Sequence, residues 1–451
     1  MKQASLFEIP ETYYVFNLGC PKNLVDAEVM ATRLEEAGWG AVSDPEDASL
    51  LVVTTCAFIA QAEEESIEEI LRISSAKGRR QRLVVAGCLV SREREELKNL
   101  LPEVDLFLAV DEMATLPERL VQTAGRMGRR GVRPYGRRIL FTPPHLAYVK
   151  IADGCSNHCS YCTIPSIRGE LTSLGREGIL EETSCMVSSG VKELAIVAQD
   201  TGAWDMERGA GSGLYGLLRD IGEVVGEAVW IRLMYMHPAH VDLKQLVALF
   251  TADAICRYLD IPIQHVSDSL LERMGRGYGK RDLVRIFDYL RSRVEGLVLR
   301  TTVMVGFPGE TEENHRELIG FLEDYAFDHV GIFVYSPEAG TEAASLGDRV
   351  PVTEAQSRRD EVLDIQMDIS HERLQSLVGS AERVLVDGLL PAEERPLPGV
   401  WGIGRYYGQA YEIDGVTFLS GTAREVGSFV TAQIDDAQAY DLFASTGRNF
   451  D

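Results

Sequence analysis

The stretch that decides how the middle of this chain folds is Asp153-Gly154-Cys155-Ser156-Asn157-His158-Cys159-Ser160-Tyr161-Cys162. Its three cysteines have the spacing C-x3-C-x2-C, and the stretch directly follows the apolar run 146–151. Three thiolates on one short loop can hold three irons of a 4Fe-4S cluster, which leaves the fourth iron open to a small chelating molecule. The amino and carboxylate groups of S-adenosylmethionine are the natural chelator. We therefore predict that Cys155, Cys159 and Cys162 are metal ligands.

The same spacing has a simpler interpretation, because close cysteines in an intracellular protein often bind zinc. Structural zinc needs four ligands. His158 could be the fourth, but it lies inside the loop between two of the cysteines, and no second cysteine pair follows nearby. The ligand count favours iron.

Six strand-like runs begin with the one before this loop. They cover 146–152, 193–198, 230–236, 258–263, 298–305 and 329–335. The stretches between them are long enough for helices, and helical spacing is visible in 178–189 and 281–294. This alternation predicts a parallel sheet with crossover helices, curled into a full or partial barrel whose site lies at the strand carboxyl ends.

Several polar or small residues near these strand ends are candidates for cofactor binding. Tyr161 directly precedes the last cysteine, and Gly306 opens the turn 306–311 after the fifth strand. We expect further side chains to point into the barrel mouth, namely Gln199, Asp200, Arg232, Gln264, Arg300, Tyr335 and Ser336. Each of them, taken alone, is as consistent with an ordinary loop residue as with a ligand.

Residues 12–125 form a separate alternating segment. Its expected strands are 13–18, 50–54, 82–86 and 106–109, and its expected helices are 24–37 and 60–74. The pattern predicts a small doubly wound α/β domain, in which ligands lie outside the strand carboxyl ends.

A cysteine follows each of the first three strands of this segment. Cys20, Cys56 and Cys88 are far apart in sequence, but they would converge on one edge of the sheet. A lone cysteine is often only a small buried hydrophobe. Three at three successive strand ends instead suggest a second, auxiliary 4Fe-4S cluster with one open iron. Cys185 and Cys256 do not fall at these strand ends, and we interpret them as structural.

Length and composition restrict the remaining possibilities. With 451 residues, the chain is long enough for about three domains. It has eight cysteines, no signal peptide in residues 1–10 and no apolar run of membrane length. These features favour a reducing cytoplasm over a disulfide framework or a membrane.

Charge argues against a nucleic-acid-binding surface. The formal net charge is −24, whereas phosphate binding usually requires a basic face. One exception is the segment 126–138, which contains six arginines and no acidic residue. We interpret 126–142 as an exposed basic linker, with a phosphate or partner contact as the alternative.

The last part of the chain has its own pattern. A polar helical run, 353–377, precedes short strands at 382–387, 401–406, 416–419 and 428–434, which are separated by glycine-containing turns. From 380 to 451 there are eleven acidic and five basic residues. A small acidic β-barrel of this kind suits a basic protein better than a polyanion.

Together these segments resemble the methylthiotransferases of the radical S-adenosylmethionine superfamily over nearly the whole chain. The motifs that carry the resemblance are Leu18-Gly19-Cys20-Pro21-Lys22-Asn23-Leu24-Val25-Asp26, Thr54-Thr55-Cys56 and Ala86-Gly87-Cys88, besides the Cys155 loop. The resemblance implies an N-terminal methylthiotransferase domain at 12–125. It also implies a partial six-stranded radical barrel with a connecting helix at 143–376 and a TRAM domain at 377–446.

The words Pro21 to Asp26, Tyr258 to His265 and Tyr335 to Glu338 are similar to the branch of this family that acts on a ribosomal protein. That branch adds a methylthio group to the β-carbon of an aspartate in small-subunit ribosomal protein twelve. The resemblance implies two 4Fe-4S clusters, with S-adenosylmethionine as both radical source and methyl donor. The cofactors carry the difficult chemistry, because an unactivated C–H bond has no usable acidity. A low-potential electron donor such as flavodoxin is also implied.

Two alternatives stay open. A methylthiotransferase acting on transfer RNA would be expected to have a basic C-terminal barrel and a Gln-Met-Asn word after the first cysteine, and the sequence has neither. A non-catalytic iron-sulfur redox sensor would explain the cysteines and the acidity. The sensor hypothesis would not explain the six-stranded barrel or the 306–311 turn.

Overall fold

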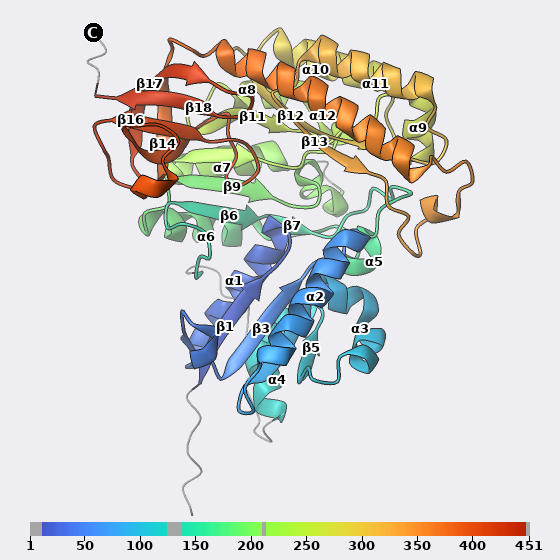
Figure 1. Cartoon of the computed structure of the whole chain (residues 1–451), viewed down its shortest axis with the longest axis vertical. Helices are drawn as coiled ribbons and strands as arrows, with labels where there is room; N and C mark the ends of the chain where they lie inside the picture. Colours follow the sequence, from blue (N-terminus) through green and yellow to red (C-terminus); the bar gives the residue numbers. More distant parts are fainter. Residues whose placement is uncertain (1–10, 124–137, 210–212, 448–451) are drawn as a thin grey trace, which may run out of the picture. The chain divides into compact units, whose positions relative to one another are not determined.

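A computed structural model describes residues 11–123, 138–209 and 213–447, which form two compact units (Figure 1). Unit 1 contains the described residues up to Phe141 together with Cys162–Glu170, and unit 2 contains Thr142–Tyr161 and Leu171 onward. Most of the predicted basic linker lies outside the described residues. Its Arg138 is described, and this side chain forms a 2.9 Å ion pair with buried Glu28 of unit 1.

Unit 1 is built on a parallel five-stranded sheet in the order β2-β1-β3-β4-β5. Its strands are β1 (Thr12–Asn17), β2 (Gly40–Ala41), β3 (Leu50–Thr55), β4 (Arg82–Gly87) and β5 (Leu106–Leu108). Its helices are α1 (Pro21–Glu36), α2 (Ala60–Ala76), α3 (Cys88–Leu100), α4 (Leu116–Thr123) and α5 (Ile164–Arg168). The strands β3 and β4 are rich in Leu and Val and almost fully buried, as expected for strands covered on both faces.

Each face of this sheet has its own hydrophobic core. One core joins the sheet to α1 and α4 through Met30, Leu34 and Leu116. The other joins it to α2 and α3 through Ile70 and Leu97. Helices on both faces of a parallel sheet define a doubly wound α/β domain, so the predicted fold class of this segment is confirmed.

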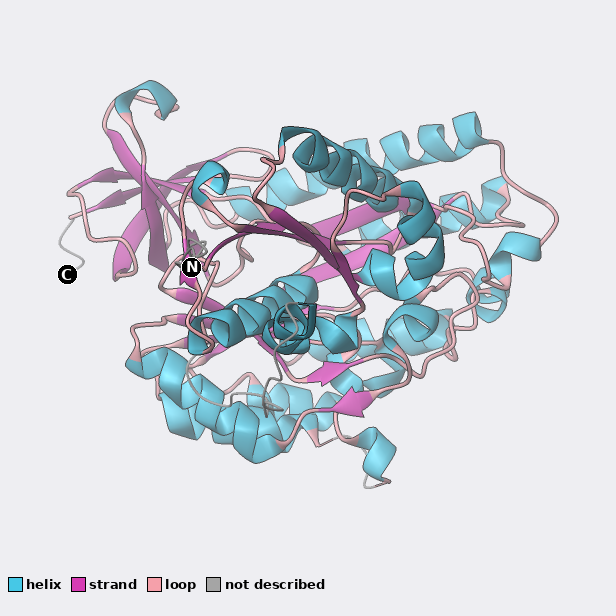
Figure 2. Ribbon diagram, turned by 90° about the horizontal axis from the view of Figure 1, so that it is seen from below, coloured by secondary structure: helices cyan, strands magenta, loops and turns pink. Residues whose placement is uncertain are grey.

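The main sheet of unit 2 has six parallel strands in the order β13-β12-β11-β10-β9-β6, with β6 and β13 at its edges. The strands are β6 (Leu146–Lys150), β9 (Glu193–Val197), β10 (Trp230–Leu233), β11 (Ile255–Asp260), β12 (Val298–Val305) and β13 (His329–Val334). The helices are α6 (Arg176–Ser188), α7 (Leu214–Val225), α8 (Leu243–Leu249), α9 (Asp268–Arg273), α10 (Lys280–Arg291) and α11 (Glu312–Tyr325). Neighbouring strands are consecutive βα units, as in a barrel that is left open, and helices border the sheet in Figure 2. A separate two-stranded antiparallel sheet pairs β7 (Ala152–Asp153) with β8 (Thr172–Ser173).

The C-terminal part of unit 2 is a closed five-stranded barrel that follows the long helix α12 (Val352–Gln375). Its strands are β14 (Ala381–Leu389), β15 (Val400–Tyr406), β16 (Thr417–Gly421), β17 (Phe429–Ala437) and β18 (Leu442–Thr446). Leu374 of α12 packs into the barrel core beside Val384 and Ile434. The predicted small β-barrel is therefore confirmed. The strand β18, which closes it, was not predicted from the sequence.

A buried ion-pair network joins this barrel to the six-stranded sheet. Arg405 of β15 is 1% exposed and pairs with Glu193, the first residue of β9, and with Asp387 of β14, each at 2.7 Å. Glu193 also accepts a 2.6 Å hydrogen bond from Arg232 of β10. His145 completes the network through its 2.9 Å contact with Asp387. Because Glu193 lies at the amino end of its strand, these contacts attach the C-terminal barrel to the amino ends of the sheet.

The carboxyl group of Asp387 gives this junction a defined pH dependence. Burial opposes its ionisation, but the hydrogen bond from His145 and the charge of Arg405 outweigh burial and hold its pKa below the usual value. A carboxyl group with a lowered folded-state pKa stabilises the fold above its unfolded pKa, near 4, and loses that contribution as the pH falls. We expect thermal unfolding, followed by circular dichroism from pH 5 to pH 3, to show a smaller loss of stability for Asp387→Asn than for the unsubstituted chain. Equal losses would contradict this assignment.

Among the described residues, no helix combines the length and the hydropathy that a membrane crossing requires.

Candidate iron-sulfur sites

Three cysteines of unit 1 follow neighbouring parallel strands. Cys20 comes after β1 and caps α1, Cys56 follows β3, and Cys88 begins α3 after β4. In the sheet, β2 lies on one side of β1 and β3 lies on the other, so β1 is at the topological switch point. A doubly wound sheet binds its ligands in the crevice at such a point. The charge of Cys20 raises the pKa of Cys56, and the charges of Cys20 and Cys56 raise that of Cys88, so the three thiols share one electrostatic neighbourhood.

Two glycines and one asparagine let the chain turn tightly at this edge. Gly19 and Gly87 have φ of +102° and +112°, a region that favours glycine. A Cβ at Gly87 would lie 2.8 Å from the carbonyl oxygen of Thr55, so a larger residue would separate β3 from β4. Asn23 is 1% exposed and donates to the carbonyls of Leu18 and Thr55. The turns that hold the cysteines are therefore fixed by backbone contacts.

The charges around these thiols differ from one cysteine to the next. Burial opposes ionisation of Cys20, but the charges of Lys22 and Arg168 and hydrogen bonds from backbone N–H groups outweigh it and lower its pKa. Burial raises the pKa of Cys56, and raises that of Cys88 to about 11. Metal coordination would have to supply the charge that keeps the buried thiols ionised, since the thiolate is the ligating form.

The second group of cysteines lies on the loop after β6. Its backbone is held by Ser160, whose N–H donates to Met274 and whose hydroxyl donates to Arg273 at 2.8 Å. Gly275, at φ +70°, brings the backbone after α9 against this loop, since a Cβ there would lie 3.3 Å from the carbonyl oxygen of His158. Cys155 and Cys159 belong to unit 2, whereas Cys162 groups with unit 1.

A buried arginine contacts this loop. Arg276 is 6% exposed, and its guanidinium donates to the sulfur of Cys159 at 3.2 Å and to the hydroxyl of Tyr161 at 3.3 Å. Further hydrogen bonds to Tyr278 and to the carbonyl of Pro262 fix its position. This residue is not among those that the sequence predicts for the site. The only available signal was its place in the glycine-rich word Met274-Gly275-Arg276-Gly277-Tyr278.

Predicted cofactor contacts Gln199, Gln264 and Gly306 lie after their strands, at the carboxyl edge of the sheet. Gln199 donates to Asp153, next to the cysteine loop, at 3.3 Å. Gln264 has φ of +64°, which is unusual for a residue with a side chain and is typical of positions held for function. The N–H of Gly306 donates to Glu310, whose carboxylate pairs with Arg358 of α12 at 3.0 Å.

Two histidines at the same edge were also missed. His237 and His240 follow β10, and one ligand-type atom from each lies within 4.8 Å of one from Asp200. Asp200 is 2% exposed, contacts His240 at 2.6 Å and accepts a hydrogen bond from Asn157 of the cysteine loop. Burial and the nearby charge of Arg276 lower the pKa of His237 to about 3, so its ring is neutral. Tyr335 and Ser336 follow β13, and Ser336 donates to Glu338.

The predicted placement of two arginines is corrected by the structure. Arg232 is 1% exposed and donates to Glu193 and to the carbonyl of Tyr407, both at 2.6 Å. Arg300 donates to Asp260 at 3.1 Å and lies 3.5 Å from Asp414. Because their partners include residues of the C-terminal barrel, these guanidinium groups face the junction with the C-terminal barrel. They do not face the predicted cofactor site at the mouth of the six-stranded sheet. They bind the two parts of unit 2 together.

The two remaining cysteines lie within a helix and a strand of unit 2 and not on the loops that carry the two groups. Cys185 is on α6, and Cys256 is buried on β11, where burial raises its pKa to about 12. We expect Cys185→Ser and Cys256→Ser to retain the iron content and visible absorption of the unsubstituted chain, because neither thiol is a ligand in our assignment. A reproducible loss of iron in either variant would overturn that assignment.

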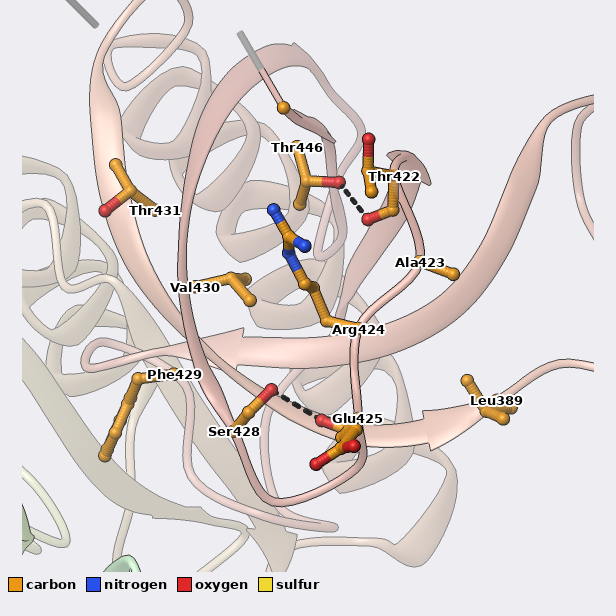
Figure 3. Close-up of a pocket in the computed structure, with 11 residues that line it drawn as sticks. Leu389, Thr422, Ala423, Arg424, Glu425, Ser428, Phe429, Val430, Thr431 and Thr446 are labelled. Atoms are coloured by element: carbon orange, nitrogen blue, oxygen red, sulfur yellow. Dashed lines mark hydrogen bonds between the residues drawn. The ribbon is translucent and has the colours of Figure 1, made fainter. Parts of the chain in front are cut away.

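A separate pocket of about 990 Å³ opens on the C-terminal barrel (Figure 3). Arg424 projects into it near Thr446 and Val430. The residues that line it include no cysteine, so it is distinct from the two groups of cysteines.

Three family models match the chain in succession. They are "Uncharacterized protein family UPF0004" at 12–109, "Radical SAM superfamily" at 149–322 and "TRAM domain" at 378–446. Solved structures support the fold. The radical S-adenosylmethionine methyltransferase TsrM from Kitasatospora setae is 14% identical, with a TM-score of 0.54 over 86% of this chain and 80% of that one. The cobalamin-dependent S-adenosylmethionine radical enzyme OxsB is 12% identical, with a TM-score of 0.51 over 74% and 54%.

An open parallel sheet with a C-x3-C-x2-C loop after its first strand, matched by the superfamily model, defines a radical S-adenosylmethionine enzyme. Curated relatives named ribosomal protein uS12 methylthiotransferase RimO match almost end to end. The protein of Syntrophus aciditrophicus is 42% identical over 96% of this chain and 97% of its own length. That of Thermotoga maritima is 40% identical over 95% and 98%. The chain belongs to the RimO family of methylthiotransferases.

Proposed function

We propose that this enzyme adds a methylthio group to the β-carbon of an aspartate in ribosomal protein uS12. The observation that carries the proposal is the pair of cysteine groups at strand carboxyl ends, in a chain whose relatives are named for that protein. We propose Cys155, Cys159 and Cys162 as ligands of the radical cluster and Cys20, Cys56 and Cys88 as ligands of the auxiliary cluster. The proposed domains are 12–125, 143–376 and 377–446, with a linker at 126–142.

The donor chemistry fits two site-differentiated clusters. Each group offers three soft thiolate ligands, and each has one cysteine sulfur within reach of a buried arginine. When bound, the clusters and S-adenosylmethionine supply the electron, the hydrogen abstraction and the sulfur that acid–base side chains cannot.

The residues of the chain bind and orient these groups. We propose that Tyr161, Gln199, Gln264 and Gly306 contact S-adenosylmethionine. Asp153 and Asp200 hold Gln199 and Asn157 in place around the cysteine loop. Arg358 fixes Glu310 and, through it, the backbone at Gly306.

The acidic C-terminal barrel supports a basic protein as the substrate. Glu393, Glu394, Asp435 and Asp436 are exposed on it. Opposite charges on the two proteins would speed their encounter and would not favour RNA. A low-potential donor such as flavodoxin is proposed as the electron source.

The test begins with anaerobic reconstitution of both clusters, followed by S-adenosylmethionine and dithionite. One reaction receives uS12 and the other unmodified transfer RNA, and both products are analysed by mass spectrometry. A methylthio gain on an aspartate of uS12 supports the proposal, while a gain on RNA would place the chain with transfer-RNA methylthiotransferases of the MiaB type. No gain and no 5′-deoxyadenosine would leave a redox sensor as the explanation. The variant Cys155→Ala/Cys159→Ala/Cys162→Ala is the matched control.

A further inference from the structure

Arg168 is the last residue of α5 and one of the most completely buried charged side chains of unit 1. Its side chain is 1% exposed. One guanidinium nitrogen pairs with Asp26 of α1 at 2.9 Å, and the other donates to the sulfur of Cys88 at 3.5 Å. The partners of this group therefore include a carboxylate and a cysteine sulfur.

The packing of α5 fixes this position. Ile167 is 6% exposed and belongs to the same core as Cys88 and Leu89 of α3. Thr163, just before the helix, donates to the carbonyl of Phe58 at 3.4 Å, two residues after Cys56. The helix ends at Gly169, whose φ of +76° turns the chain away. These contacts hold the helix in place. The Arg168 side chain therefore starts from a fixed point of the backbone.

Three thiolates in one crevice repel one another, and a positive charge beside them offsets that repulsion. An arginine is suited to the task because its guanidinium stays protonated and has several donors in a fixed plane. Hydrogen bonds to cluster sulfurs and nearby charge are also among the means by which proteins set the reduction potential of an iron-sulfur cluster.

We propose that Arg168 is a positioning residue of the auxiliary cluster, which holds the Cys88 ligand in place and raises the reduction potential of that cluster by its charge. This inference rests on the proposed assignment of Cys20, Cys56 and Cys88 as cluster ligands. The same short segment, Cys162–Glu170, thus carries a proposed ligand of the radical cluster and an arginine that serves the auxiliary cluster.

The test uses the full chain with Cys155→Ala/Cys159→Ala/Cys162→Ala, so that only the auxiliary cluster forms. In this parent we would compare Arg168→Gln and Arg168→Lys by iron content, electron paramagnetic resonance and a redox titration. Arg33→Gln is the matched control, because Arg33 also pairs with carboxylates in unit 1, at 3.0 Å from Glu118, without contacting a cysteine.

We expect about four irons per chain in the parent and in the control. Arg168→Gln should lower the ratio of reduced to oxidised cluster at a fixed potential about tenfold, which corresponds to about 59 mV for one electron. Arg168→Lys should recover most of that shift. Retention of the cluster only when residue 168 is positively charged would also support the proposal.

Three results would overturn it in distinguishable ways. A parent that binds no iron would remove the assignment of the auxiliary ligands and this inference with it. A parent with about four irons whose potential is the same with Arg168, Arg168→Gln and Arg168→Lys would overturn the role of Arg168 alone. Loss of the cluster from both Arg168 variants would make the residue a structural one and not a tuning one.

Discussion

The Cys159→Ala variant should release no detectable 5′-deoxyadenosine from S-adenosylmethionine and should retain about four of the eight irons expected for two clusters. Cys159 is a proposed ligand of the radical cluster, and its sulfur accepts a hydrogen bond from Arg276. Without this thiolate, the loop keeps two cysteines, which are too few to hold a cluster with one open iron. Iron analysis and chromatography of the reduced reaction mixture would measure both effects.

The complementary variant is Cys88→Ala, which removes a ligand from the other group. It should also retain about four irons. We expect it to release 5′-deoxyadenosine but to transfer no methylthio group to uS12, since the two groups supply different parts of the reaction. Loss of 5′-deoxyadenosine from Cys88→Ala but not from Cys159→Ala would reverse our assignment of the two sites.

Replacing Arg405 with methionine should destabilise unit 2 by about 3 to 5 kcal/mol. Arg405 is fully enclosed and binds both Glu193 and Asp387, so its loss would take one cation away from each of two buried carboxylates. For a unit of this size, the expected decrease in Tm is about 10 °C. Differential scanning calorimetry of the full chain would measure it.

Arg395→Met is the matched control, because Arg395 is exposed on the same C-terminal barrel. Its Tm should change by no more than about 1 °C. Adding Glu193→Gln and Asp387→Asn to Arg405→Met should recover part of the lost stability, since the uncompensated charges are then removed. A Tm for Arg405→Met equal to that of the control would contradict a stabilising role for the junction.

The sequence predicted the sheets well, because their strands are rich in apolar and β-branched residues and cysteine or glycine follows several of them. The run Leu50-Leu51-Val52-Val53 is a strand for this reason, and Cys56 follows it where the chain turns. The helix α3 was missed because its residues from Ser91 to Asn99 are almost all polar. The last strand, β18, was missed because a five-residue run at the end of a domain has little periodicity to detect.

The arginines were the least predictable part of the site. Arg232 is bound by Tyr407, a residue 175 positions later in the chain, and periodicity gives no information about such a pair. An arginine inside a barrel therefore resembled a cofactor ligand. Arg168 and Arg276 were overlooked because nothing near them in the sequence indicates a cysteine contact. Their sulfur partners lie 80 and 117 positions away.

The grouping of Cys162–Glu170 with unit 1 has a consequence for how this family can diversify. A recombination point near residue 142 would appear to exchange the whole N-terminal domain between two relatives. It would in fact leave Arg168 and Ile167 behind in the recipient gene, opposite an Asp26 and a Cys88 from another lineage. We therefore expect a chimera to keep these contacts when residues 162–170 come from the same parent as residues 12–109, as one discontinuous module.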